Sequence, residues 1–134
     1  MRCNVSTKPN TIEVGNAYDQ GCAGTGWFIG HFVDSPKSLR RRNDIEVKWG
    51  IHVANERRAQ ANAYQQSTTL SLLVSGSFRI EFPETSDIVD LTRPGDYVIF
   101  GPNVLHDWVS LTDAVVITVR WPSIHGEVTP KSVS

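Results

Sequence analysis

The chain has 134 residues, of which 40% are hydrophobic and 20% are charged. This length is close to that of one domain, and the composition is ordinary for a globular protein and too apolar for a disordered one. Because 13 Lys and Arg stand against 14 Asp and Glu, the formal net charge is −1, and the broad positive field that non-specific nucleic-acid binding needs is missing. We therefore expect one domain over residues 1–134 that does not bind nucleic acid.

The cysteines and the N-terminus bear on the cellular compartment. The sequence has two cysteines, Cys3 and Cys22, and neither lies in a C-x-x-C or Cys/His cluster, so neither a disulfide framework nor a structural zinc site is expected. The N-terminal sequence MRCNVSTKPN lacks the apolar stretch of a signal peptide, and no apolar run reaches the ~18 residues of a membrane helix. We expect a cytoplasmic protein in a reducing compartment, without a membrane partner.

Alternation with a period of two, in runs rich in β-branched and aromatic residues, predicts that strands dominate the chain. The expected strands are residues 27–33, 45–53, 69–74, 78–82, 88–91, 97–100, 105–109 and 114–121. Ser75-Gly76 is a tight hairpin signal, and turn residues at 94–96 and 101–103 mark further reversals. Short strands at hairpin spacing predict an all-β antiparallel sandwich or barrel.

The faces of two strands can be assigned from alternation. In 45–53 the apolar residues share one face, predicted to be core, while Glu46, Lys48 and His52 share the other. In 114–121 both faces are apolar, which predicts coverage by a second layer or a second subunit, so a homodimer is expected. By the same alternation Trp49 and Trp121 are expected in the core.

The remaining segments are less regular. Residues 55–66 contain helix formers but no long apolar stripe, and a loop is expected. Residues 1–24 and 123–134 are polar and are expected to be arms or frayed ends around a core of about 45–121. Arg40–Arg42 is a like-charge run, which predicts a solvated turn, with a phosphate or carboxylate site as the alternative.

The segment GDYVIFGPNVLHDW, Gly95–Trp108, has the most specific spacing in the chain. It resembles the second motif of the cupin family, in which a glycine is followed after five residues by a Pro-x-Gly turn and, after two more, by a histidine. Gly95 and His106 stand at that separation, while Gly101 takes the place of the proline and Asn103 that of the glycine.

The segment Thr68–Phe82 is similar to the end of the first cupin motif, where a glutamate precedes a glycine by seven positions. Counting back from Gly76 gives Thr69, and the family's His-x-His pair falls within Asn62–Gln65, which contains no histidine. The resemblance, over about 45–121, implies an antiparallel double-stranded β-helix, or jelly-roll barrel. It also implies that His106 is the one metal ligand kept from the usual set.

The resemblance further implies that His106 faces the barrel interior, beside a mostly apolar pocket typical of small-molecule sites. Candidate ligand-binding residues are Thr69, Ser71, Phe78, Ile80, Trp108 and His52. His106 is either an acid/base group or a core histidine bonded to Thr69. A rebuilt Fe, Mn, Ni or Zn site would need three donors, such as His52 and His106 with Glu46 or Glu56. His31 is expected to be a half-buried, hydrogen-bonded ring and His125 a tail residue.

Three functions follow from these residues. The first is a small single-domain cupin that binds a small molecule in its barrel without the usual metal. The second is an enzyme, either a metal-dependent oxygenase or isomerase with relocated ligands, or a metal-free isomerase, lyase or cyclase that uses His106. The third is an interaction module that docks a partner through Arg40–Arg42 or a tryptophan-rich surface. The sequence leaves the choice between binding protein and enzyme open.

Overall fold

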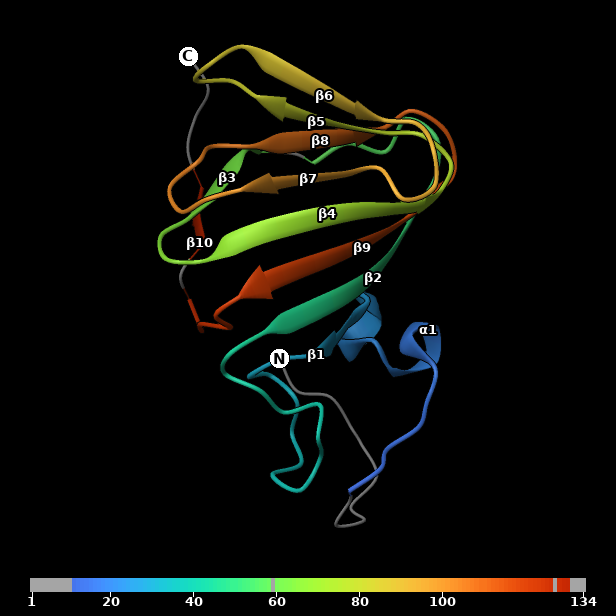
Figure 1. Ribbon diagram of the computed structural model, residues 1–134, viewed down its shortest axis with the longest axis vertical. Coiled ribbons are helices and arrows are strands. Elements are labelled where there is room, and N and C mark those ends of the chain that lie inside the picture. Colours follow the sequence, from blue (N-terminus) through green and yellow to red (C-terminus); the bar gives the residue numbers. More distant parts are fainter. Residues whose placement is uncertain (1–10, 59, 127, 131–134) are drawn as a thin grey trace.

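Antiparallel strands make up most of the chain in the computed structural model, which describes residues 11–58, 60–126 and 128–130. The strands are β1 (Trp27–Ile29), β2 (Glu46–His52), β3 (Asn62–Tyr64), β4 (Thr68–Ser75), β5 (Phe78–Phe82), β6 (Asp87–Leu91), β7 (Tyr97–Phe100), β8 (Asp107–Ser110), β9 (Ala114–Trp121) and β10 (Val128–Pro130). They form a five-stranded sheet β1-β2-β9-β4-β7, a three-stranded sheet β6-β5-β8 and the pair β10-β3 (Figure 1). The all-β jelly-roll expectation is confirmed.

The connection between β4 and β5 is a crossover between sheets, which corrects the hairpin predicted at Ser75-Gly76. β4 pairs with β7 and β9, whereas β5 pairs with β6 and β8. Gly76 has a φ of +83°, and a Cβ there would lie 2.1 Å from the carbonyl oxygen of Asp113. The turn therefore packs against the loop before β9, and glycine is required by both its backbone conformation and this contact.

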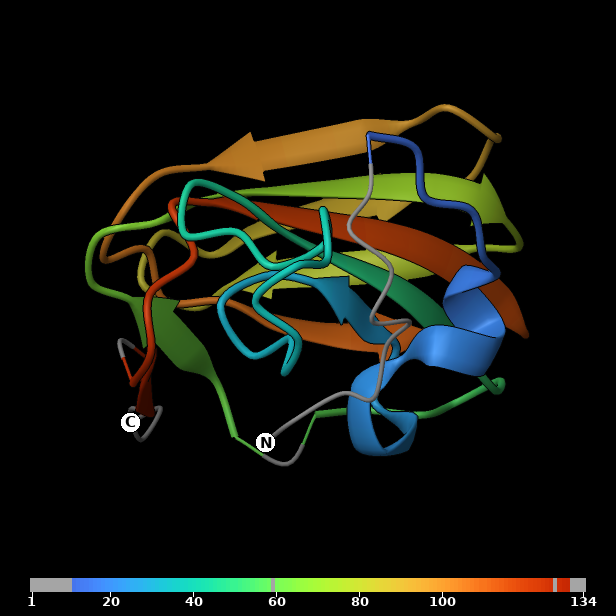
Figure 2. The same cartoon turned by 90° about the horizontal axis from the view of Figure 1, so that it is seen from below.

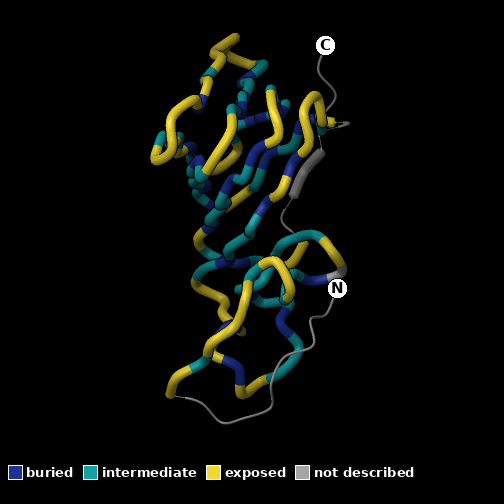
Figure 3. The backbone as a smooth tube through the Cα atoms, turned by 90° about the vertical axis from the view of Figure 1, so that its right-hand side faces the viewer, coloured by how far each residue is buried: buried dark blue, intermediate teal, exposed yellow. Residues whose placement is uncertain are grey.

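The core lies between the two sheets. It is formed by apolar side chains that alternate inward along the strands, namely Leu73, Phe78, Ile80, Phe82, Leu91, Phe100, Ala114 and Val116. Figure 3 shows buried and more exposed residues alternating along the strands. The boundaries predicted for β5, β7 and β9 are confirmed.

The inward face of β2 is the polar one, which reverses the prediction from alternation. Glu46 and His52 are buried, while Ile51 is 51% exposed. The apolar residues of β2 instead lie on the outer face of the five-stranded sheet, and Trp49 and Trp121 are there rather than in the core. The inward position of a polar face means that this part of the barrel interior is a polar cavity, since an apolar core would leave such groups unsolvated.

Several other expectations are corrected. The supposed loop 55–66 contains β3, which pairs with β10 of the supposed C-terminal arm. The described part of the N-terminal arm contains helix α1 (Ala17–Gln20) and the 3-10 turn η1 (Cys22–Gly24), which lie beside β1 at one end of the molecule (Figure 2). β1 ends at Ile29, so it is shorter than the predicted strand 27–33.

The arginine run is not a uniformly solvated turn. Arg40 is buried and its Nε lies 3.2 Å from a carboxylate oxygen of Glu13, while its Nη1 donates to the carbonyl oxygen of Phe28. Arg42 is paired with Asp44 at 2.6 Å on the surface. The run therefore divides into a buried anchor for the N-terminal segment and a surface ion pair.

The two cysteines were expected to be unpaired. Cys22 is buried and disulfide-bonded, and the other cysteine of the sequence, Cys3, lies outside the described residues. Within the described part of the chain, no helix has the length and hydrophobicity to cross a bilayer.

Candidate functional site

A small cavity inside the barrel brings together every ligand-site residue predicted from the sequence. The inner cavity has a volume of about 40 Å³ and is lined by Lys48, His52, Arg58, Thr69, Ser71, Phe78, Ile80, Phe100, His106, Trp108, Val116, Thr118 and Arg120. The five-stranded sheet supplies a polar wall through the inward side chains of β2, β4 and β9. The three-stranded sheet supplies an apolar wall through β5 and β8.

Three cationic residues of the inner cavity were missed by the sequence analysis. Lys48 is on the inward face of β2, Arg58 lies in the segment before β3, and Arg120 is on the inward face of β9. Lys48 was assigned to the solvated face of its strand, and Arg58 to a loop with no position in the barrel. A signal for Arg120 was present, since alternation along 114–121 places it on the same face as Val116 and Thr118.

Arg120 is the one of these cations that has a carboxylate partner in the described structure. Its Nη1 donates to Glu46 at 2.7 Å, and Glu46 also accepts from the hydroxyl of Ser123 at 2.8 Å. The guanidinium lies between two aromatic rings, 3.7 Å from the centroid of Tyr64 and 4.4 Å from that of Trp27. These contacts fix Arg120 in place and leave its buried Nε without a hydrogen-bond partner.

Lys48 and Arg58 have no carboxylate oxygen within 4 Å among the described residues. Burial, followed by the charges of Arg120 and Arg58, lowers the pKa of Lys48 to about 8, and Glu56 acts in the opposite direction. Burial also lowers the pKa of Arg58, although a guanidinium stays charged at neutral pH. The inner cavity therefore carries positive charge that its own side chains do not neutralise.

His106 is neutral and is held by its two ring nitrogens. Nδ1 lies 3.1 Å from the carbonyl oxygen of Val104, which can only accept, so Nδ1 carries the proton and Nε2 has the free lone pair. That lone pair faces Nη1 of Arg58 at 3.5 Å. Burial lowers the pKa of His106 to about 4, opposed by the Val104 carbonyl and reinforced by Arg58 and Arg120. His106 thus orients Arg58.

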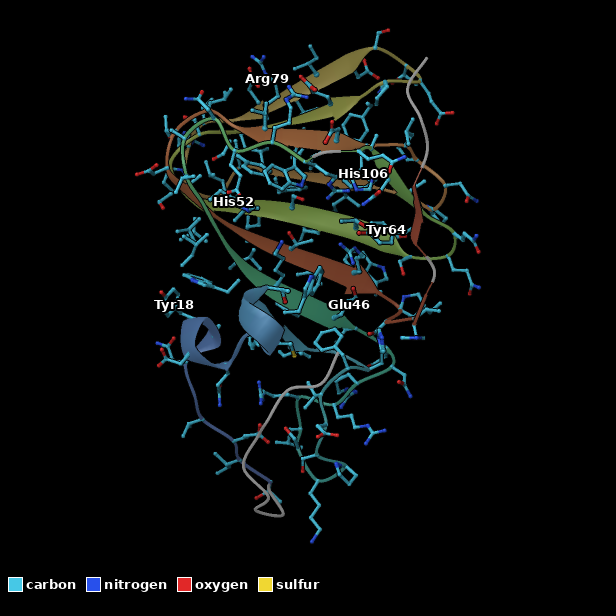
Figure 4. All side chains as sticks on the ribbon, turned by 180° about the vertical axis from the view of Figure 1, so that it is seen from behind. Tyr18, Glu46, His52, Tyr64, Arg79 and His106 are labelled. Atoms are coloured by element: carbon cyan, nitrogen blue, oxygen red, sulfur yellow. The ribbon has the colours of Figure 1, made fainter. Side chains whose placement is uncertain are left out.

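Thr69 is not bonded to His106, which corrects one of the two roles proposed for that histidine. Thr69 is 2% exposed, and its hydroxyl has no hydrogen-bond partner in the described structure. It lines the inner cavity on the inward face of β4, at the position where the resemblance expects a glutamate. Tyr64 stacks on His106 with ring centroids 5.6 Å apart, and Figure 4 shows these two residues close together with His52 farther along the barrel.

His52 forms a pair with Glu56. Its Nδ1 lies 3.1 Å from Oε1 of Glu56, and its ring packs against Trp108 and Phe78 at centroid distances of 4.6 and 5.0 Å. Because a carboxylate accepts, Nδ1 carries the proton and Nε2 is left as an acceptor. Burial and the charge of Lys48 lower the pKa of His52, and Glu56 opposes them.

A larger pocket lies next to the inner cavity and shares Lys48, His52 and Trp108 with it. This mouth pocket has a volume of about 680 Å³ and is lined also by Tyr18, Asp19, Gly24, Thr25, Gly26, Trp49, Ile51 and Glu56. It lies where β2 extends past the short β1, between β2 and the segment that carries α1. The three shared side chains separate the two spaces.

The donor set of the inner cavity does not fit a divalent metal ion. A mononuclear site needs at least three donors, about 2.0–2.3 Å from the ion. Glu46 is bonded to Arg120 and Ser123, Glu56 is bonded to His52, and Nε2 of His106 faces a guanidinium. No group of three or more His, Cys, Asp or Glu suited to a metal occurs among the described residues. A cation would moreover meet Lys48, Arg58 and Arg120.

His31 and His125 lie outside the barrel. Nδ1 of His31 is 2.6 Å from the hydroxyl of Ser123, so this half-buried ring is hydrogen-bonded as predicted. His125 is exposed, and its ring lies 5.5 Å from that of His31. Both line a third hollow of about 540 Å³, which meets the inner cavity at Arg120.

Comparison with known proteins identifies the fold. No family model and no curated protein matches the sequence. A Klebsiella pneumoniae protein with a double-stranded β-helix domain has a TM-score of 0.58 at 15% identity, covering 67% of this chain and 76% of that one. A cupin superfamily protein from Desulfitobacterium hafniense has a TM-score of 0.53 at 15% identity, with 60% and 70% covered. A sugar phosphate isomerase of the cupin superfamily from Silicibacter pomeroyi has a TM-score of 0.51 at 15% identity, with 60% and 52% covered.

Proposed function

Since the chain has the double-stranded β-helix fold of the cupin superfamily, we propose that it binds a small anionic molecule in its barrel without a metal ion. The observation that carries this proposal is the pair of cations, Lys48 and Arg58, which line the inner cavity and have no carboxylate partner among the residues that the structure describes. Lys48 and Arg58 are half-buried, and charges of one sign that lose part of their hydration are costly unless a counter-charge is present. An anionic ligand supplies that counter-charge.

The hydroxyl of Thr69 and Nε of Arg120, which have no hydrogen-bond partner in the part of the chain that the structure describes, support the same ligand. Both are donors, and buried donors without acceptors are rare in folded proteins. A carboxylate or phosphate oxygen accepts from each of them, and a guanidinium binds such groups with two parallel hydrogen bonds. The inner cavity therefore offers hydrogen-bond donors from three strands and one loop to a single anionic group.

The volumes indicate how such a ligand is divided between the two spaces. One water molecule takes about 10–15 Å³ of such a cavity, so the inner cavity of about 40 Å³ accommodates a few waters or one carboxylate group. The mouth pocket of about 680 Å³ accommodates the rest of a small organic acid, beside Trp49 and Tyr18. The ligand class is a small carboxylic acid whose anionic end is buried.

Titration with L-lactate, a small organic acid, tests the proposal. We expect lactate to raise the melting temperature in a saturable way, whereas neutral lactamide leaves it unchanged, because ligands that bind the native state stabilise it. Replacing Arg58 with Gln should weaken lactate binding by roughly tenfold or more, the cost of a charged hydrogen bond. Arg93→Gln removes an equal charge from an exposed turn and is the matched control. Equal responses to lactate and lactamide would contradict the proposal.

The metal-free enzyme that uses His106 as proton shuttle is the less favoured alternative. The pKa of about 4 leaves His106 uncharged at neutral pH and a weak base, and its free lone pair is directed at Arg58. A positioning role for His106 agrees better with these contacts. The metal-dependent alternative does not agree with the donor set described above.

A homodimer is the second part of the proposal. Two cross-strand rows of uncharged side chains cover the outer face of the five-stranded sheet, Val47-Val119-Leu70-Ile99 and Trp49-Ile117-Leu72-Tyr97. Tyr97 and Ile99 are 62% and 51% exposed. A contiguous apolar face of this kind marks an interface. A second copy related by a two-fold axis presents the same uncharged face, so its docking buries no charge.

The cytoplasm is the compartment expected from the sequence, and it remains a proposal. The disulfide at Cys22 counts against it, because persistent disulfides are rare in the cytosol.

A further inference from the structure

We propose that Lys48 is a nucleophile that forms a reversible imine with an aldehyde or ketone carrying an anionic group. This inference rests on the proposed function, since the cations around Lys48 would hold the anionic end of the carbonyl compound. It assigns a covalent role to a residue that lies at the boundary between the inner cavity and the mouth pocket.

The position of Lys48 carries the inference. Its side chain lines both spaces, whereas Arg58 lines the inner cavity and is not among the residues that line the mouth pocket. The Nζ atom lies 5.8 Å from the ring centroid of Trp27, and no carboxylate oxygen of the described residues lies within 4 Å of it. A lysine placed to stabilise the fold would ordinarily be paired or would extend to solvent.

The charges around Lys48 favour its uncharged, nucleophilic form. Arg120 approaches from β9 and Arg58 from the segment before β3, and both disfavour a third cation, while Glu56 favours one. Together with burial they bring the pKa of Lys48 to about 8, so about half of the amines are uncharged at pH 8. Desolvation next to other cationic groups is a known way of activating a lysine toward carbonyl carbon.

His52 can move the protons that this step requires. It lies on the same inward face of β2 as Lys48, with Gly50 between them, and its Nδ1 proton is bonded to Glu56. A Cβ on Gly50 would lie 2.9 Å from Nε2 of His52, so the absence of a side chain makes room for this ring. The free Nε2 therefore lies on the Gly50 side of His52, the direction along β2 in which Lys48 follows.

The step balances without a further reactant. The uncharged amine of Lys48 attacks the carbonyl carbon, the N–C bond forms, and the carbonyl oxygen takes up a proton. Loss of that hydroxyl with a second proton then releases one water and leaves a C=N bond. His52 accepts the proton from nitrogen and returns it to the departing oxygen, and no oxidation occurs.

Trapping with pyruvate and sodium cyanoborohydride at pH 8 tests the inference on the full chain. The reductant converts the imine to a stable secondary amine, which is located by mass spectrometry of peptides. Lys37 is exposed and is the internal comparison. Because about half of the Lys48 amines are uncharged at pH 8, we expect Lys48 to be labelled roughly tenfold more than Lys37. Equal labelling of the two lysines would overturn the inference.

Two further probes separate this inference from the proposed function. Acetaldehyde carries the carbonyl without the anion, and lactate carries the anion without the carbonyl. Stronger labelling by pyruvate than by acetaldehyde, suppressed by lactate, supports both. Stabilisation by lactate without excess labelling at Lys48 refutes the imine alone. Excess labelling that is equal for acetaldehyde and pyruvate, and is not suppressed by lactate, supports the nucleophile and refutes the anion site.

The variant Lys48→Arg checks the chemistry independently. It keeps the positive charge but cannot form an imine, so the pyruvate adduct at this position should be lost. Persistence of an adduct of the same mass and yield in Lys48→Arg would show that another amine reacts, and would overturn the inference.

Discussion

The neutral imidazole of His106 has a consequence for stability that can be measured. Its pKa is about 4 in the folded chain and about 6.5 when unfolded, so between these values the unfolded state binds a proton that the folded state does not. Above pH 6.5 His106 is uncharged in both the folded and the unfolded chain, so it adds nothing to the pH dependence of stability. As pH falls from 6.5 to 4, the free energy of unfolding decreases. A shift of this size corresponds to about 3 kcal/mol.

Replacement of His106 by Gln should remove this part of the pH dependence. We expect the free energy of unfolding, measured by urea denaturation, to fall less between pH 6.5 and 4 in the variant than in the parent chain. His125 is exposed, and His125→Gln, which removes an imidazole outside the barrel, is the matched control. If the free energy of unfolding had the same dependence on pH in His106→Gln and in the parent chain, His106 would have to bind protons equally in the folded and unfolded states, which would contradict this prediction.

At the scale of the elements, β2 shows why the site was only partly predictable. Period-two alternation correctly predicted a strand and correctly separated its polar from its apolar face. It could not tell which face points inward, because the rule that the apolar face is core fails where the interior is a binding cavity and the exterior an apolar sheet face. Because of this reversal, the predicted site omitted Lys48, and it included His52 only as a candidate ligand-binding residue.

The resemblance to the cupin motifs predicted the site residues of β4, β5 and β8 better. Thr69, Phe78, Trp108 and His106 line one cavity, as the resemblance implied. Arg58 could not be found in this way, because it lies in an irregular segment whose position depends on the isolated bridges Arg57–Val109 and Asn62–His106. Irregular segments have no period from which direction can be inferred.

The crossover between β4 and β5 gives an element-scale prediction. Gly76→Ala places a Cβ against the Asp113 carbonyl at a positive φ, so we expect a loss of more than about 1 kcal/mol in the free energy of unfolding. Gly95→Ala is the control, because it has a φ of +96° but open space around the new Cβ. Urea denaturation should show the larger loss for Gly76→Ala. Equal losses would mean that the close contact with Asp113 contributes nothing.

At the scale of the whole molecule, the barrel combines a charged interior with an uncharged outer sheet face. Over part of the structure, this arrangement inverts the usual distribution of charged side chains outside and apolar side chains inside. The apolar outward face of β9 is the feature from which the sequence predicted a second covering layer. The inward residues of β9 pass from Ala114 and Val116 in the core to Thr118 and Arg120 in the cavity. Its outward residues remain apolar along the strand.

Sedimentation at micromolar concentration tests the proposed dimer. We expect a species of twice 14.9 kDa. Ile99→Glu should raise the dissociation constant by roughly tenfold or more, since a charge buried in an apolar interface costs over about 1.4 kcal/mol. Ile88 is 59% exposed on the other sheet, so Ile88→Glu should leave the mass unchanged. A parent chain that sediments as a monomer would contradict the dimer.

The most direct test of the anion site is a crystal structure of the chain grown or soaked with lactate. The account predicts a carboxylate in the inner cavity, within hydrogen-bond distance of Arg58 and of the Thr69 hydroxyl, with the rest of the molecule toward Lys48 and the mouth pocket. A metal ion coordinated by His106 and His52, or a cavity that holds only water at saturating lactate, would contradict it.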